Sequence, residues 1–270
     1  SGMEKLHFFQ SGTVFRTGAQ MFTQFSEITA ESGVSGVTLA STNGVLNLSE
    51  SNIGSAVTVL SAIAPATDPT FQNGGVRIFD GNDAGGRTLI GTPNADTLSG
   101  LGGNDLLQGG QGADTLLGGD GNDVFVIVSA TDLISGKVIS GGSGTDTLSV
   151  LGSSIRILVS AKLAIETMEI FDLSGGADAG VIVSMPAADL EAFSTITGDG
   201  TSDVIAAFEG DYTLLSSSTL TNIEAIVLND PAGGFNNGAQ NFIIQDGATI
   251  TGLKSVLGTV SASGAPDDNI

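Results

Sequence analysis

Single apolar residues recur at nine-residue intervals in the middle of the chain. They are Leu98, Leu107, Leu116 and Phe125. Successive side chains of a β-strand point to opposite faces, so an apolar residue between two outward neighbours predicts a short strand with one inward side chain. Two repeats then make one coil, with a turn and a strand on each side. The turns expected to stack are 91–96 over 109–114, and 100–105 over 118–123.

A longer repeat follows the nine-residue pattern. The sequence "GGSGTDTL" at 141–148 recurs as "GDGTSDVI" at 198–205, and "AIETMEIFDLSGG" at 164–176 recurs as "NIEAIVLNDPAGG" at 222–234. The repeat is ~57 residues long, and units that cannot bury a core alone must stack on their neighbours. We therefore predict a continuing parallel β-solenoid over 128–270, with the chain ending inside a further repeat.

The remaining segments divide into an N-terminal region and a transition into the repeats. Residues 1–2 are interpreted as a vector remnant, 3–70 as a β-rich N-terminal region and 71–127 as the β-roll. Within 3–70, "GAQMFTQFSEITAES" predicts a short helix, Asn43-Gly44 and Asn52 predict turns, and "PATDP" predicts a break. Arg87 stands where the nine-residue period would place an Asp, so this rung is interpreted as a cap of the array.

The composition limits the possible partners. The 270-residue chain carries 29 acidic and 8 basic residues, a formal charge of −21, which argues against nucleic acid or anionic lipid. No apolar run reaches the ~18 residues of a membrane span. The apolar residues are mostly Ala, Val, Leu and Ile, with many Ser and Thr, which favours strands and an all-β fold. The chain has no cysteine, so if it is secreted it must be stabilised by something other than disulfides, for example a metal ion.

Each nine-residue unit places an Asp at the end of a glycine-rich turn. Glycine adopts positive φ at little cost, so such turns can direct their carbonyl oxygens inward beside the Asp carboxylate. A set of oxygen ligands without His or Cys suits Ca²⁺, whereas Zn²⁺ prefers nitrogen and sulfur and Mg²⁺ requires stricter octahedral geometry. We therefore predict bound calcium, with Asp96 and Asp105 as the main carboxylates of two internal ions and Asp114 and Asp123 facing the next layer.

The predicted metal ligands are of two kinds. The acidic candidates are Asp96, Asp105, Asp114, Asp120, Asp123, Asp146 and Asp203. The glycine candidates, which shape the turns and supply carbonyls, are Gly91, Gly100, Gly102, Gly109, Gly110, Gly112, Gly118, Gly119, Gly121, Gly141, Gly142 and Gly144. No catalytic residue and no organic cofactor are predicted.

The stretch "GLGGNDLLQGGQGADTLLGGDGNDVFV" resembles the nonapeptide repeat of the RTX family, whose pattern is G-G-x-G-x-D-x-apolar-x. The resemblance covers 91–126 and 141–149, and 198–206 more loosely. It implies a right-handed parallel β-roll that binds calcium in its turns, in proteins exported from Gram-negative bacteria by a type I system. Three turns depart from the pattern: "GTPNAD" lacks two glycines, "GLGGND" has Leu101 at the second position, and "GDGTSD" shifts its glycine spacing.

Sites for common secreted enzymes are missing from the sequence. His7 is the single histidine, so H-E-x-x-H is excluded, and "SGVSGV" does not complete a G-x-S-x-G nucleophile elbow. We therefore expect a structural calcium-binding segment of a secreted or cell-surface protein, similar to RTX-type S-layer proteins and adhesins, with other copies of itself or surface glycan as candidate partners. The alternative is the non-catalytic module of a type I-secreted protease, lipase or polysaccharide-modifying enzyme.

Overall fold

The computed structural model describes residues 5–17, 27–41, 45–48, 52–53, 57–62, 77–80, 85–129, 132–133, 136–151, 156–158, 164–175, 180–208, 211–228, 241–257 and 259–263. These residues form parallel β-strands with one short helix. The all-β parallel fold expected from the sequence is confirmed. The chain divides into two compact units: residues 1–126 with 136–146, and residues 127–135 with 147–270.

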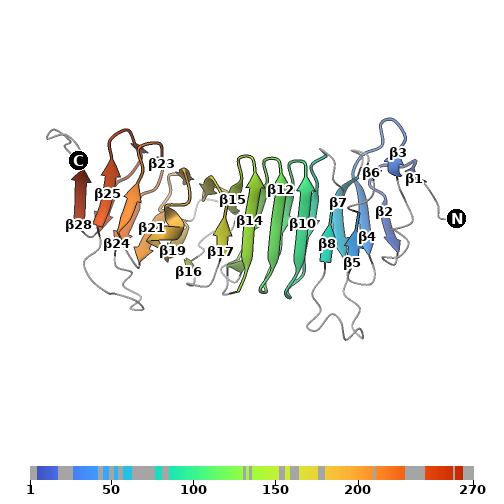
Figure 1. Cartoon of the computed structure of the whole chain (residues 1–270), viewed down its shortest axis with the longest axis horizontal. Helices are drawn as coiled ribbons and strands as arrows, with labels where there is room; N and C mark the ends of the chain where they lie inside the picture. The colour runs from blue at the N-terminus through green and yellow to red at the C-terminus, as the bar shows by residue number, and fades with distance from the viewer. Residues whose placement is uncertain are drawn as a thin grey trace. The chain divides into compact units, whose positions relative to one another are not determined.

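The first unit consists of parallel strands in three sheets (Figure 1). One sheet has the order β1 (Lys5–Phe8), β3 (Glu27–Ala30) and β6 (Asn52–Ile53). The second runs β2 (Val14–Thr17), β4 (Val37–Ser41), β7 (Val57–Ala62), β9 (Thr88–Ile90), β11 (Leu106–Gln108) and β13 (Val124–Ile127). The third runs β5 (Val45–Asn47), β8 (Arg77–Phe79), β10 (Thr97–Gly102), β12 (Thr115–Asp120) and β14 (Val138–Ser143).

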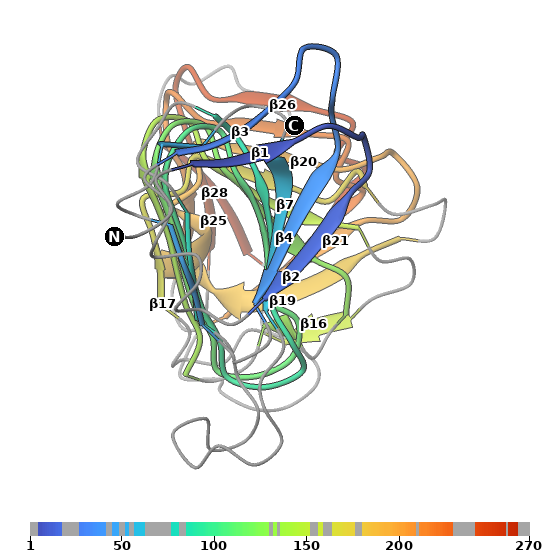
Figure 2. The ribbon, with the colours of Figure 1, turned by 90° about the vertical axis from the view of Figure 1, so that its right-hand side faces the viewer.

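The register of these strands confirms the coil of two nine-residue repeats. Leu98 of β10 pairs with Leu116 of β12, and Leu107 of β11 pairs with Phe125 of β13. All four side chains are buried, as expected for the inward position of a short strand. In the end-on view the turns of successive coils of the array lie over one another (Figure 2). The nine-residue period therefore produces a stack of strands in which each strand contributes one apolar side chain to the core.

Two predictions for the N-terminal region are wrong where the structure describes them. Residues Glu27–Ala30, expected at the end of a helix, form β3, and Asn52, expected in a turn, begins β6. The reason is the parallel pairing of β3 with both β1 and β6, which buries Ile28 completely. Tertiary pairing thus overrides a local helical pattern. The predicted turn at 43–44 and the break at 65–69 lie outside the described residues.

The second unit also holds parallel strands. One row is β15 (Thr147–Val150), β18 (Ile170–Asp172), β20 (Thr195–Thr197), β23 (Thr219–Thr221) and β26 (Thr249–Thr251). Another is β16 (Arg156–Leu158), β19 (Ile182–Pro186), β21 (Val204–Phe208), β24 (Ala225–Leu228) and β27 (Ser255–Leu257). A third is β22 (Tyr212–Leu214), β25 (Asn241–Gln245) and β28 (Thr259–Ser263). The unit also contains β17 (Ala164–Glu166) and the helix α2 (Ala187–Leu190).

Coils of the second unit are longer and less regular than those of the array. Ile170 pairs with Thr195, Thr195 with Thr219, and Thr219 with Thr249, so the distance along the chain between partners changes from coil to coil. The longer repeat of the sequence therefore spans more than one coil. Its two Gly-Asp turns also precede strands of different sheets, β15 and β21.

Aromatic pairs fill the core of the second unit. Phe171 stacks on Phe193 with ring centroids 5.0 Å apart, and Tyr212 stacks on Phe242 at 5.3 Å. All four side chains are buried, which lets the wider coils close around larger groups than the Leu column of the array. None of the helices in the described part of the chain is long and apolar enough to cross a membrane.

Candidate metal site

The aspartates that end the glycine turns bind the backbone in one repeating pattern. The N–H of Asp96 donates to Oδ1 of Asp114 at 2.9 Å, that of Asp105 to Oδ1 of Asp123 at 2.7 Å, and that of Asp123 to Oδ1 of Asp146 at 2.8 Å. All five side chains are buried. One oxygen of each of the three accepting carboxylates therefore satisfies the backbone of the preceding layer, and the second oxygen decides what else the carboxylate can bind.

The second oxygens of Asp105 and Asp123 are buried and have no hydrogen-bond partner among the described residues. A Cβ atom built on Gly100 would clash with Oδ2 of Asp105 and with the carbonyl oxygen of Gly118. One built on Gly118 would clash with Oδ2 of Asp123 and with the carbonyl oxygen of Gly141. A carboxylate oxygen and a carbonyl oxygen of the next layer thus face the same small space, which glycine leaves free of any side chain.

The electrostatics of these two aspartates favour a cation. Burial raises the pKa of Asp105 to about 7, with a partly opposing hydrogen bond from the Arg87 N–H and a further increase from the Asp80 carboxylate. Burial likewise raises the pKa of Asp123 to about 6, with a hydrogen bond from the Asp105 N–H opposing it and Asp146 adding to it. Charged carboxylates out of contact with water need a partner of opposite charge.

The turn backbone explains the glycine spacing. At the second turn position Gly110, Gly119 and Gly142 have φ of 81°, 118° and 110°, in the left-handed region that favours glycine. Leu101 occupies the same position with φ 66°, so this departure from the repeat leaves the turn conformation in place. A Cβ atom on Gly119 would also clash with the carbonyl group of Leu101, since successive turns approach closely.

The turns 91–96 and 198–203 also lack glycine at the second position. In both, a donor of the same turn binds the second carboxylate oxygen of the final Asp. Oδ2 of Asp96 accepts hydrogen bonds from the N–H and, at 3.1 Å, the hydroxyl of Thr92. Oδ2 of Asp203 accepts from the Asp199 N–H at 2.9 Å, and its Oδ1 accepts from the Val181 N–H at 2.8 Å. These carboxylates are satisfied by protein donors. The structure therefore places open oxygens on Asp105 and Asp123, whereas the sequence assigned the internal ions to Asp96 and Asp105.

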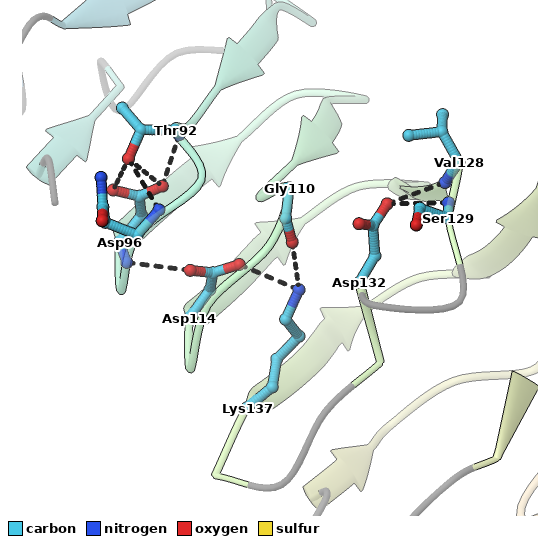
Figure 3. Close-up of polar contacts among 9 residues, drawn as sticks. Thr92, Asp96, Gly110, Asp114, Val128, Ser129, Asp132 and Lys137 are labelled. Atoms are coloured by element: carbon cyan, nitrogen blue, oxygen red, sulfur yellow. Dashed lines mark hydrogen bonds and ion pairs between the residues drawn. The ribbon is translucent and has the colours of Figure 1, made fainter.

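Lys137 is a buried residue of this site that sequence reasoning missed. Its Nζ lies 2.9 Å from Oδ2 of Asp114 and donates to the Gly110 carbonyl oxygen at 2.8 Å (Figure 3). The pairing of Thr115 with Val138 puts Lys137 at the position of the next Asp in the column. The signal in the sequence was weak, because the spacing between layers grows here from 18 residues to 23 residues and the nine-residue period no longer locates the position.

Arg87, interpreted as a cap, also binds oxygen atoms inside the turn stack. Its Nη1 lies 3.1 Å from Oδ2 of Asp80 and donates to the Gly85 carbonyl oxygen at 2.7 Å, and both charged side chains are fully buried. Its N–H donates to Oδ1 of Asp105 at 2.7 Å, which continues the carboxylate pattern by one layer. The first rung of the array is thus held by an ion pair.

The other predicted ligands lie in the same turns. Asp120 ends β12, and its side chain is exposed. The fourth turn positions also have positive φ; they are Gly103, Gly112, Gly121 and Gly144. Among the described residues no group of three His, Cys, Asp or Glu side chains gathers as a metal cluster.

Residues 90–125 match the family model of the RTX calcium-binding nonapeptide repeat, in four copies. No curated protein and no solved structure matches the chain. The matched segment is a calcium-binding repeat region of the RTX type, and its carboxylate and carbonyl oxygens are the ligands that calcium prefers. Asp146 and Asp203 lie outside the matched residues.

Proposed function

We propose that this chain is a structural segment of a secreted or cell-surface protein whose nonapeptide array folds when it binds extracellular calcium. The observation that carries the proposal is the pair of buried Oδ2 atoms, on Asp105 and Asp123, that face carbonyl oxygens of the next layer. In a folded array without a cation, these carboxylates would have to be protonated or remain charged and unpaired. Both cost free energy at neutral pH.

Asp105 and Asp123 would hold calcium with their open carboxylate oxygens, and the ion would supply the positive charge that neutralises them. The chain contributes the geometry: Oδ1 of each Asp fixes the preceding layer, and Gly100 and Gly118 keep side chains out of the space beside Oδ2. Because the ligands come together only in the folded array, binding free energy becomes folding free energy. Extracellular calcium sites bind at ~10⁻⁴–10⁻³ M, so such an array stays unfolded in a bacterial cytosol and folds outside.

The proposed setting is the exterior of a Gram-negative bacterium, reached by type I export. The acidic, cysteine-free and glycine-rich composition, together with stacked parallel coils, supports a non-enzymatic role of the S-layer or adhesin type. Other copies of the chain and surface glycans are the partners we propose besides calcium. The second candidate is the non-catalytic module of a type I-secreted enzyme, and it rests on the same array. Sequencing the whole gene separates the two, because it reveals either further repeats or a catalytic domain.

Calcium titration tests the proposed function directly. After removal of metal with a chelator, circular dichroism should show a gain of β-structure as calcium rises through the millimolar range, together with a higher Tm. Magnesium at the same concentrations should not reproduce the change, because it requires an octahedral site. An identical spectrum and Tm in chelator and in saturating calcium would overturn the proposal.

A further inference from the structure

The array contains two columns of turns, and each has one basic residue in an Asp position. The first column runs Asp96, Asp114 and Lys137, and the second runs Arg87, Asp105, Asp123 and Asp146. The final coil is 23 residues long on both sides, because Asp146 follows Asp123 and Lys137 follows Asp114 at that spacing. The same coil thus presents a carboxylate to one column and an ammonium group to the other.

Lys137 contacts two oxygens of the kind that calcium takes in an RTX turn. One is the second carboxylate oxygen of Asp114, at 2.9 Å, and the other is the carbonyl of the second turn residue, Gly110, at 2.8 Å. Figure 3 shows the lysine side chain extending from its own layer to these two atoms. Oδ1 of Asp114 meanwhile accepts the Asp96 N–H, as the other aspartates of the array do for their preceding layers.

The contact between Lys137 and Asp114 is a buried ion pair rather than a surface one. The Lys137 side chain is 1% exposed and that of Asp114 is fully buried. An ammonium group carries a compact charge and three donors, so it can bind several oxygens of one turn at once. The corresponding oxygens of Asp105 and Asp123 have no such hydrogen-bond donor within the described residues.

We propose that the ammonium group of Lys137 occupies the position that a calcium ion would take beside Asp114. The first column therefore binds one calcium ion fewer. The inference rests on the proposed calcium function of the array. It makes the two columns unequal: ions bind beside Asp105 and Asp123, while the last layer of the first column is joined by a cation that the chain carries itself. That junction is independent of the calcium concentration.

The test compares ion counts in the intact chain and two variants. Lys137→Gln removes the charge and leaves an amide oxygen that can serve as a ligand, and Lys137→Arg is the matched control that keeps the charge. Native mass spectrometry at saturating calcium should count one more ion on Lys137→Gln than on the wild type, and the same number on Lys137→Arg. At the lowest calcium concentration that folds the wild-type array, Lys137→Gln should melt at least ~5 °C below the wild type, because a buried carboxylate loses its partner.

Equal ion counts in the wild type and Lys137→Gln would overturn the assignment of Lys137. A wild type that binds no calcium would instead overturn the proposed function, so the two failures are distinct. If Lys137→Gln does not fold, crystals of the wild type grown in calcium decide the question by anomalous diffraction. Ions beside Asp105 and Asp123 with none between Asp114 and Gly110 support the proposal, and an ion between the latter two overturns it.

Discussion

The two units of the chain stack their acidic turn residues in the same way but satisfy the second carboxylate oxygen differently. In the array, Asp105 and Asp123 each accept one backbone N–H from the preceding layer and leave Oδ2 without a hydrogen bond among the described residues. In the second unit, Asp203 accepts N–H groups with both oxygens. One architecture therefore contains both layers with an open carboxylate oxygen and a layer whose carboxylate is satisfied by backbone donors.

The difference follows from the turns. In the turns that end at Asp105 and Asp123, the second residues, Leu101 and Gly119, have positive φ, and Oδ2 has no hydrogen bond among the described residues. In the second unit, Asp199 takes that position and its own N–H binds Asp203, whose N–H in turn donates to Glu224 at 2.8 Å. Glu224 pairs with Lys254 at 3.4 Å. In the second unit, backbone donors thus satisfy both oxygens of the turn carboxylate.

The largest expected effect comes from removing the charge of the two open carboxylates. Asp105→Asn with Asp123→Asn keeps an oxygen for the backbone N–H but weakens calcium binding. At calcium 100 times Kd, each lost ion removes about 2.7 kcal/mol of stabilisation. Calorimetry should show a smaller calcium-dependent rise in Tm, and circular dichroism in chelator should show more β-structure than in the wild type, because two buried charges are gone. The control Asp203→Asn should leave the calcium response unchanged, and an equal loss there would contradict the comparison.

Alanine substitutions at two glycines distinguish the cost of close turn packing from the cost of a left-handed backbone conformation. Gly119 and Gly200 both have positive φ, at 118° and 90°, but a Cβ atom on Gly119 would clash with the Leu101 backbone whereas one on Gly200 meets nothing within 4 Å. Gly200→Ala should cost about 1 kcal/mol for the left-handed conformation alone. Gly119→Ala should cost at least ~3 kcal/mol, because adjacent turns must also separate. Urea unfolding in saturating calcium measures both, and similar losses would mean that the turns are not tightly stacked.

Acidification should weaken calcium binding in the array. Burial raises the pKa of Asp105 to about 7 and that of Asp123 to about 6, so protons compete with calcium below neutral pH. Going from pH 7 to pH 6, affinity beside Asp105 should fall about fivefold. Without calcium, the free energy of unfolding has the opposite pH trend. The folded state binds more protons than the unfolded state, so the free energy of unfolding should fall as pH rises from about 4 to 7. Isothermal titration at pH 8, 7 and 6 checks the first trend, and Asp105→Asn should reduce it.

The smallest expected effect concerns Lys254, the counterpart of Lys137 in the second unit. Its side chain is 67% exposed and lies 3.4 Å from Glu224, so water screens the pair. Lys254→Gln should change the free energy of unfolding by less than ~1 kcal/mol and leave the number of bound calcium ions unchanged. A loss comparable to that of Lys137→Gln at low calcium would show that exposure does not distinguish the two lysines.

The local pattern predicted the array well and the rest of the chain less well. The inward positions of Leu98 and Phe125, the coil of two repeats and the stacking of alternate turns all followed from a strict nine-residue period. The helix expected within 18–32 is wrong where the structure describes it, because Glu27–Ala30 form β3, which pairs on both sides. The longer repeat spans more than one coil, and strands of unequal spacing pair in the second unit.

The sequence by itself determined which residues face inward and which acids end the turns, since both depend on short-range alternation and on the backbone freedom of glycine. Only the tertiary structure decided which carboxylate oxygens are open. Asp96 and Asp203 are closed by donors of their own turns, and Asp114 is closed by Lys137 from the next coil. That last contact depends on the register of β12 with β14, which the lengthened coil sets and no local period reveals.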